Sequence, residues 1–336
     1  MAELQALREF QRATLKGLID ESLENRLPSF ADRFLPQVPT YSTTFAYDII
    51  KTNTHIAAMI GVGAEPPVID RDAVASMHGK IAKFGIKYIA TEEELMAIFQ
   101  ARSDGERQAM VNKLLTKATD LADMVQRRFD VTKLQAIGLG KFVYNDNNVK
   151  VDVDFGIPAA HKKTLTSTDK WDDAASDPVA NLQDWVRTYA AENGKQPDVI
   201  YMSREVAAAL MKNPTLVLES GRPVGVTRAT MADVQAVMAS YGLPTIEVVD
   251  DRSITVKNVY TGENEVIEFF PSNRVVMVSE GLGEFLVGPT VENDFQPGVF
   301  VDAYDKKEPI ESILRAVGAG FPALENPALL FHADVI

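Results

Sequence analysis

The chain has 336 residues, no cysteine and a formal net charge of −13. Without cysteine, disulfides, thiolate nucleophiles and zinc–sulfur sites are excluded. An acidic chain is also poorly suited to direct binding of DNA or RNA, because neutralising phosphates requires lysine and arginine. No run approaches the roughly 20 apolar residues of a membrane helix, and the charged N-terminal stretch predicts no signal peptide.

The first 50 residues predict an arm. An amphipathic helix is expected over residues 2–25, with one narrow stripe of leucines at Leu4, Leu7, Leu15 and Leu18. The narrow stripe and the terminal position favour an arm that lies on another surface, and a packed first helix is the alternative. Three prolines followed by a β-branched and aromatic run predict an extended segment over residues 28–50 that ends in a strand.

Residues 61–90 predict two extended runs, because Glu-Pro-Pro breaks any helix there. The stretch "KIAKFGIKYIA" alternates with the period of a strand and contains Lys80, Lys83 and Lys87. A two-stranded excursion is marginal by itself in water, so it needs a partner surface on this chain or on a neighbour. The lysines are explained as charges that keep exposed strands from pairing with other chains.

Two helices follow. Thr91 is a good N-cap, with three acidic residues behind it, for a short helix over residues 92–101. The strongest helical pattern covers residues 106–137, where apolar residues follow the helical period at Val111, Leu114, Ala118, Leu121, Val125 and Phe129. At about 1.5 Å per residue this helix is more than about 40 Å long, which suits the backbone element of an elongated domain.

A hairpin is predicted over residues 141–156, around the turn sequence "NDNN". Its second strand ends in Asp154-Phe155-Gly156, a triplet that holds magnesium in protein kinases. The glycine-rich loop and the catalytic loop of a kinase are both missing upstream, so the metal assignment fails. Strand alternation places the valines and Phe155 on one face, with Asp152 and Asp154 on the other, as surface or intersubunit carboxylates.

The second half of the chain predicts an α/β pattern after a polar boundary at residues 158–178. The expected elements, in order, are a helix at 178–192, a strand at 198–203, helices at 204–212 and 226–242, a strand at 245–251, a hairpin, and a strand at 273–280. The remaining residues, 298–336, mix strand-like runs with an apolar end.

The sequence contains no recognisable catalytic constellation. The four histidines, His55, His78, His161 and His332, have no spacing typical of ligands, and each is expected to be structural. Glycine-rich nucleotide motifs, the Ser-x-x-Lys motif at 167–170 and a calcium loop near "NDNN" all lack their required partners. No catalytic residue, cofactor or metal ligand is predicted.

Asp250 and Asp251 are the most enzyme-like remaining feature. They follow a predicted strand, and ligands bind beyond the carboxyl ends of strands in α/β sheets. Two acids at this position are also common at the start of a turn, which is the favoured interpretation. Long arms, an overlong helix and an unpaired excursion are instead typical of a chain that completes its packing with copies of itself.

A set of spaced motifs resembles the major capsid protein E family, the lambda-like head proteins of tailed bacteriophages. The resemblance covers residues 25–335 and depends on these stretches: "GAEPPVIDRD", "KFGIKYIATEEEL", "NDNNVKVDVDFG", "DPVANLQDWV", "DVIYMSREVAAAL", "FFPSNRVVMV" and "EPIESILRAVGAGFPALENPALLFHADV". It implies an α+β chain with the HK97-like fold.

The resemblance also implies a domain division. Its parts are an N-terminal arm at 1–50, an extended loop at 51–92, a P-domain at 93–172 with a spine helix at 105–137, an A-domain at 173–289, and return strands of the P-domain at 290–336. The polar boundary at 158–178 agrees with the start of the A-domain.

The implied function is self-assembly. Hexamers and pentamers would form an icosahedral shell around double-stranded DNA, and a precursor shell would expand to the mature capsid of the virion. Implied partners are a scaffolding protein, a portal and a decoration protein, with assembly in the cytoplasm of the host bacterium. The acidic charge suggests an inner wall that does not bind the DNA it encloses. No covalent cross-link is assigned to Lys80, Lys83 or Lys87.

Two rival hypotheses remain at this stage. One is an α/β enzyme or ligand-binding module centred on Asp250 and Asp251. The other is an encapsulin-like nanocompartment shell on the same fold.

Overall fold

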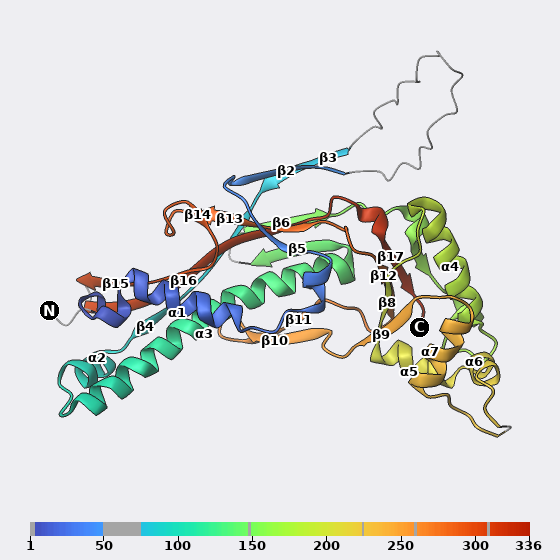
Figure 1. The fold of residues 1–336 in the computed structure, drawn as a ribbon, viewed down its shortest axis with the longest axis horizontal. Helices are drawn as coiled ribbons and strands as arrows, with labels where there is room; N and C mark the ends of the chain where they lie inside the picture. The colour runs from blue at the N-terminus through green and yellow to red at the C-terminus, as the bar shows by residue number, and fades with distance from the viewer. Residues whose placement is uncertain (1–3, 50–74, 147–148, 224, 259–260, 308–309) are drawn as a thin grey trace, which may run out of the picture.

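A long sheet and a compact sheet, both in contact with one long helix, organise the chain (Figure 1). The computed structural model describes residues 4–49, 75–146, 149–223, 225–258, 261–307 and 310–336. The long sheet and the helix run along the long axis of the molecule. The compact sheet lies at one end of this axis, together with the helices that surround it. Residues 61–74, the first part of the extended runs predicted over residues 61–90, lie outside the described residues.

The N-terminal segment is packed against its own chain, so the favoured prediction of an arm on another surface is wrong. It forms two 3-10 turns, Leu4–Ala6 and Arg8–Phe10, and the helix α1, Arg12–Glu24. Extended backbone at Gln11, with φ −67° and ψ 143°, interrupts the helix and shifts the apolar stripe from Leu18 to Ile19. Leu15 and Ile19 are fully buried, and α1 contacts both α3 and β15.

The two helices predicted at residues 92–101 and 106–137 are confirmed. The short helix α2 covers Glu92–Phe99, and the Thr91 hydroxyl accepts a hydrogen bond from the Glu94 amide at 3.3 Å. The long helix α3 covers Asp104–Leu139, 36 residues, which is about 54 Å at 1.5 Å per residue. Gly140 ends it in the left-handed conformation, with φ 68°, where glycine carries no steric penalty.

The long sheet is built around β16, Ile310–Ala323. The strand β4, Ala82–Ala90, and the strand β15, Phe300–Lys307, both pair with β16 over residues 312–317, so they lie on opposite sides of it. The other members are β13, Glu284–Thr290, β1, Gln37–Pro39, and β14, Gln296–Pro297. The stretch 82–90 therefore finds its partner surface within its own chain.

Three two-stranded hairpins stand apart from both sheets. They are β2–β3, Thr44–Ile49 with Ala75–Lys80, then β5–β6, Lys141–Asp146 with Val149–Asp154, and β10–β11, Ser253–Lys257 with Asn264–Glu268. The second of these confirms the predicted hairpin, with Phe155 buried and both Asp152 and Asp154 exposed. The ribbon β2–β3 extends away from the rest of the molecule (Figure 1).

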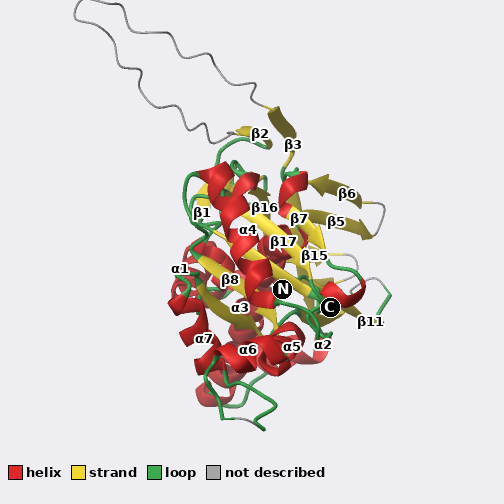
Figure 2. Cartoon of the chain, turned by 90° about the vertical axis from the view of Figure 1, so that its right-hand side faces the viewer, coloured by secondary structure: helices red, strands yellow, loops and turns green. Residues whose placement is uncertain are grey.

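The compact sheet has five strands in the order β7-β17-β12-β8-β9. Their bounds are Lys162–Thr164, Leu330–Asp334, Arg274–Val278, Val199–Ser203 and Thr245–Val249. Four helices lie around it (Figure 2): α4, Pro178–Asn193, α5, Arg204–Lys212, α6, Pro214–Glu219, and α7, Met231–Ser240. Every residue of β8, which lies between β12 and β9, is buried, as expected for the predicted buried strand at 198–203.

Two helices of this region differ from the prediction. The helix α6 was not expected. It begins at Pro214, and the Asn213 side chain before it accepts hydrogen bonds from the backbone amides of Thr215 and Leu216. The helix α7 begins at Met231 and not at residue 226, because the Thr230 and Asp233 side chains form a capping box. The Thr-x-x-Asp signal was present in the sequence but lay inside the predicted helix.

The C-terminal segment serves both sheets. The strands β15 and β16 belong to the long sheet, whereas β17 pairs with β12 in the compact sheet over five residues, Leu330–Asp334. The strand β13, at 284–290, belongs to the long sheet. The chain therefore crosses between the two ends of the molecule more often than the predicted order of segments implies.

Glycine allows α3 to approach β16 closely. A Cβ atom added at Gly318 would lie 2.9 Å from both Phe129 and Val125 of the helix, and one at Gly320 would lie 2.6 Å from the Phe285 ring. Real Cβ atoms do not tolerate such distances, so the side chains of α3 occupy space that only glycine leaves open. The aromatic rings of Phe129 and Phe285 lie 5.1 Å apart over this position.

We predict that Gly320→Ala destabilises the protein by about 1–3 kcal/mol, because the added methyl group must push Phe285 or the sheet aside. Gly17→Ala is the matched control, since an added Cβ at this α1 position meets nothing within 4 Å. The control should be neutral or more stable by about 0.5–1 kcal/mol, since alanine is the better helix former. Urea unfolding measures both changes, and equal stability of the two variants would contradict the close-packing argument.

Candidate functional site

Asp154 lies in the turn that ends β6. Its Oδ1 atom accepts a hydrogen bond from the Gly156 amide at 2.8 Å, and Gly156 has φ 74°. The carboxylate thus closes the end of β6, where glycine is needed for the left-handed backbone. No group of three or more His, Cys, Asp or Glu side chains that could hold a metal ion occurs in the described part of the chain.

Asp250 and Asp251 lie at the end of β9, at one edge of the compact sheet. Asp250 accepts hydrogen bonds from Arg204 at 2.7 and 2.9 Å, and both side chains are more than half exposed. Asp251 is exposed as well. A solvated ion pair of this kind stabilises a protein by at most about 1 kcal/mol.

The two histidines whose side chains are described are both buried. His332 on β17 donates from Nε2 to the carbonyl oxygen of Ile137 at 2.8 Å, which ties the end of α3 to the compact sheet. His161 donates from Nδ1 to the carbonyl of Leu330 at 3.1 Å and stacks on Tyr189. Both are structural, as the sequence predicts. His55, and the side chain of His78, lie outside the described residues.

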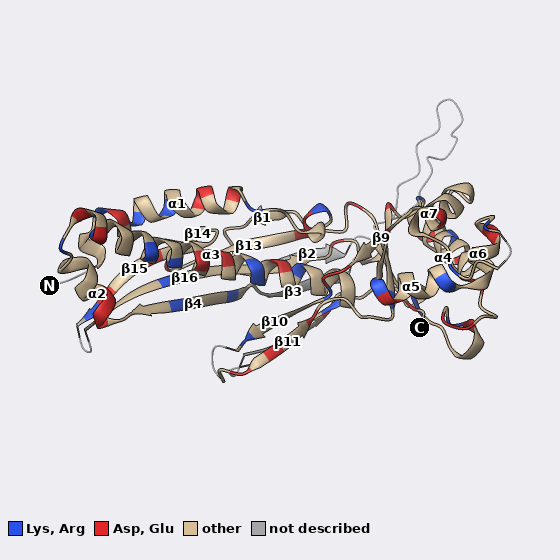
Figure 3. Ribbon diagram, turned by 90° about the horizontal axis from the view of Figure 1, so that it is seen from below, with Lys and Arg blue, Asp and Glu red and all other residues tan. Residues whose placement is uncertain are grey.

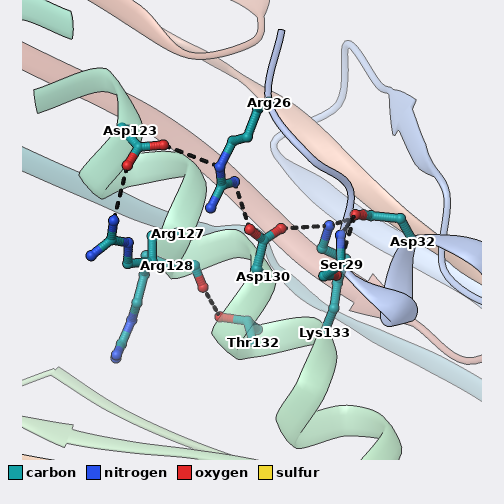
Figure 4. A network of polar contacts seen from close by, with 9 residues as sticks. All are labelled: Arg26, Ser29, Asp32, Asp123, Arg127, Arg128, Asp130, Thr132 and Lys133. Atoms are coloured by element: carbon teal, nitrogen blue, oxygen red, sulfur yellow. Dashed lines mark hydrogen bonds and ion pairs between the residues drawn. The ribbon is translucent and has the colours of Figure 1, made fainter. Parts of the chain in front are cut away.

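A network of buried charges joins the N-terminal segment to α3 (Figure 4). Lys133 of α3 is fully buried and forms ion pairs with Asp32 and, at 2.9 Å, with Asp130. Arg26 pairs with Asp130 at 2.5 Å and with Asp123 at 3.1 Å. The Lys133 ammonium also lies 5.6 Å from the centre of the Phe285 ring, within range of a cation–π contact.

Sequence analysis missed this network, although a signal was present. Lys133 stands four residues after Phe129 and four before Ile137, so it interrupts the apolar stripe of α3 with a charge. A charge on an apolar face is buried only when it is paired. Asp32, which pairs with Lys133, and Arg26, which pairs with Asp130, are each about a hundred residues away from their partners, and only the folded chain brings them together.

Of the three lysines in the predicted loop, the structure describes the side chains of Lys83 and Lys87. Figure 3 shows Lys and Arg positions along β4 in blue. Lys83 binds Glu292 at 2.7 and 2.8 Å, and this hydrogen bond lowers the pKa of Glu292 below its usual value. Lys87 is exposed, and the side chain of Lys80 lies outside the described residues. The prediction that none of them is cross-linked stays a prediction.

A groove of about 610 Å³ lies between α1, α3 and the turn that joins β13 to β14. Its walls carry both apolar and charged side chains, including Ile19, Leu23 and Asp130. Of its charged members, Arg26, Asp32 and Asp130 are engaged in the ion-pair network, whereas Lys16 and Asp20 lie outside it. None of the described helices has the length and apolar character to cross a membrane.

We predict that Lys133→Met destabilises the fold by about 3–5 kcal/mol, because it leaves Asp32 without its cation and the buried Asp130 with Arg26 alone. Lys117→Met is the control. The Lys117 side chain is 43% exposed, and its ion pair with Asp120 is weak because the two charged atoms lie as far as 3.6 Å apart. That change should cost less than about 1 kcal/mol. Denaturant unfolding of both variants tests the argument, and a small effect at Lys133 would contradict it.

His332 makes the stability depend on pH. Burial lowers its pKa from 6.5 to about 3, so between these values the unfolded chain binds a proton that the folded chain does not. The free energy of unfolding should then fall with falling pH by about 1.4 kcal/mol per unit across that window. Urea unfolding of wild type and His332→Gln, above pH 6.5 and near pH 5, should show a smaller loss in the variant. Equal losses would rule out this contribution.

Comparison with known proteins identifies the family and the fold. A family model described as phage major capsid protein E matches residues 20–332. Curated proteins give no match. The crystal structure of a protein described as the capsid protein of a prophage of Escherichia coli CFT073 is similar, with a TM-score of 0.59, 13% identity, and coverage of 97% of this chain and 99% of that chain.

A phage-related protein from Bordetella bronchiseptica RB50 has a TM-score of 0.55 and 14% identity, over 95% of this chain and 96% of that chain. Sequence identities this low establish similarity of fold alone. The class of protein is established by the match to the family model. Together they confirm the predicted HK97-like fold and the prediction of a shell-forming structural protein. The family match contradicts the rival hypothesis of an enzyme centred on Asp250 and Asp251. The chain belongs to the phage major capsid protein E family.

Proposed function

We propose that this capsid protein assembles through rings of six and five copies into an icosahedral shell that encloses double-stranded DNA, and that a precursor shell expands to the mature one. The family match over residues 20–332 is the observation that carries the proposal. Extended elements that lie outside both sheets, above all the ribbon β2–β3, agree with it, because a two-stranded ribbon gains stability from a neighbouring surface.

The domain division is part of this proposal. The segment 1–50 would be the arm, 51–92 the extended loop, 93–172 the P-domain with its spine at 105–137, 173–289 the A-domain, and 290–336 the return strands. The strands β7 and β17 pair within the compact sheet, so we count them with the A-domain. The long sheet with α3 would then form the P-domain.

Enclosure of DNA agrees with the net charge of −13. A wall that repels phosphates lets packed DNA slide and settle, whereas a basic wall would trap it through released counterions. The proposed partners are a scaffolding protein, a portal and a decoration protein, and assembly would take place in the cytoplasm of the host bacterium. An encapsulin-like compartment is the second candidate, and the cargo of the particle separates the two.

Expression of the chain in bacteria, with and without a scaffolding protein of the same genome, tests the proposal. We expect electron microscopy to show rings or closed shells of uniform size, and particles from infected cells to hold nuclease-protected double-stranded DNA. Monomers or small oligomers under all conditions would contradict shell formation. A protein cargo in place of DNA would favour the compartment.

A further inference from the structure

The two edges of the compact sheet carry opposite charge. The strand β7 forms one edge and contributes Lys162 and Lys163, whereas β9 forms the other edge and contributes Glu247, followed by Asp250 and Asp251. Both strands have a neighbour on one side only within the described residues. These are the acids that sequence analysis singled out and that neither catalysis nor metal binding explains.

The basic edge is available for contact. Lys162 is exposed and Lys163 is half-buried, and in the described part of the chain neither side chain has an ion partner. The loop that follows β7 carries Lys170 together with Asp169, Asp172 and Asp173, so the positive charge of this edge rests on Lys162 and Lys163 alone. Lysines at a sheet edge discourage indiscriminate strand pairing, and they also attract an acidic partner.

The acidic edge keeps an excess of negative charge after its internal ion pairs are counted. Asp250 is paired with Arg204, and Arg252 is shared between Glu205 and Glu268. Glu247 and Asp251 are exposed, and among the described residues neither has a cationic partner. Two guanidinium groups thus neutralise only part of the charge of five carboxylates at this edge. The remaining negative charge attracts cations from outside the chain.

The directions of the strands make the two edges compatible. The strand β7 is parallel to β17, β17 and β8 are both antiparallel to β12, and β8 is parallel to β9. Hence β7 and β9 run in the same sense at opposite edges. A second copy that is turned about a common axis can place its basic edge beside the acidic edge of the first. Such a head-to-tail contact closes into a ring at a fixed rotation.

We propose that the acidic β9 edge of one copy docks against the basic β7 edge of the next copy in the ring, with Asp250 and Asp251 opposite Lys162 and Lys163. The occupant of each edge is therefore a second copy of this chain, selected by charge complementarity. This inference rests on the proposed assembly through rings. Because the groups are solvated, they contribute partner choice and rate of association more than affinity, and the contact weakens at high salt.

Charge reversal tests the contact. One variant carries Lys162→Glu and Lys163→Glu, a second carries Asp250→Lys and Asp251→Lys, and a third carries all four changes. The control, Asp20→Lys with Glu24→Lys, reverses two exposed acids of α1, which lies along the long sheet and away from the compact one (Figure 1). Ring formation is measured by native mass spectrometry and electron microscopy, under the conditions in which the wild type forms rings.

Each two-residue variant should reduce the fraction of chains in rings about tenfold or more, since like charges face one another at every contact. The four-residue variant should restore rings, and the control should form them as the wild type does. A mixture of the two defective variants should form hexamers with alternating copies. It should form no pentamers, because an odd ring cannot alternate. Recovery by mixing also shows that both variants fold.

Rings of normal yield from either two-residue variant would overturn the inference. Failure of the four-residue variant to recover, or equal recovery of pentamers and hexamers in the mixture, would overturn it as well. Absence of rings from the wild type under every condition would instead contradict the proposed assembly, so the two failures are distinguishable.

Discussion

Close contact between the helix α3 and the strand β16 is the constraint on which the rest of the structure depends. Gly318 and Gly320 leave two positions of β16 without side chains, and Phe129 of α3 and Phe285 of β13 occupy the space above them, so that helix and sheet approach closely. A long helix has little stability of its own in water and relies on such packing along one face. With α3 fixed on the sheet, α1 and the chain around Asp32 have a surface to cover, and Lys133 acquires its partners.

The same helix connects the two ends of the molecule. Its last carbonyl groups accept hydrogen bonds from Arg274 of β12, at 3.2 Å to Gly138, and from His332 of β17, at 2.8 Å to Ile137. These two hydrogen bonds therefore couple the orientation of α3 to the position of the compact sheet. In the proposed expansion of the shell, this helix would link movement of the long sheet to the compact one.

Charge has two separate uses in this protein. The buried Lys133 and the half-buried Arg26 both pair with the buried Asp130, and these ion pairs fix the geometry between segments that are distant in sequence. Exposed charges at the two edges of the compact sheet are unevenly distributed, and they are suited to choosing a partner. Asp250, which resembles a catalytic acid in the sequence, belongs to the second group, and its ion pair with Arg204 is solvated.

Local signals determined the helices α2 and α3, the hairpin that ends at Asp154, and the buried strand β8, because caps, helical period and strand alternation act between near neighbours. Spaced motifs over the whole chain also determined the family. Tertiary structure decided what depends on distant contacts. It placed the N-terminal segment on its own chain, sent β17 into the compact sheet, and surrounded Lys133 with Asp32 and Asp130. Burial and pairing energies of these groups arise only when segments about a hundred residues or more apart meet, and no local pattern encodes that meeting.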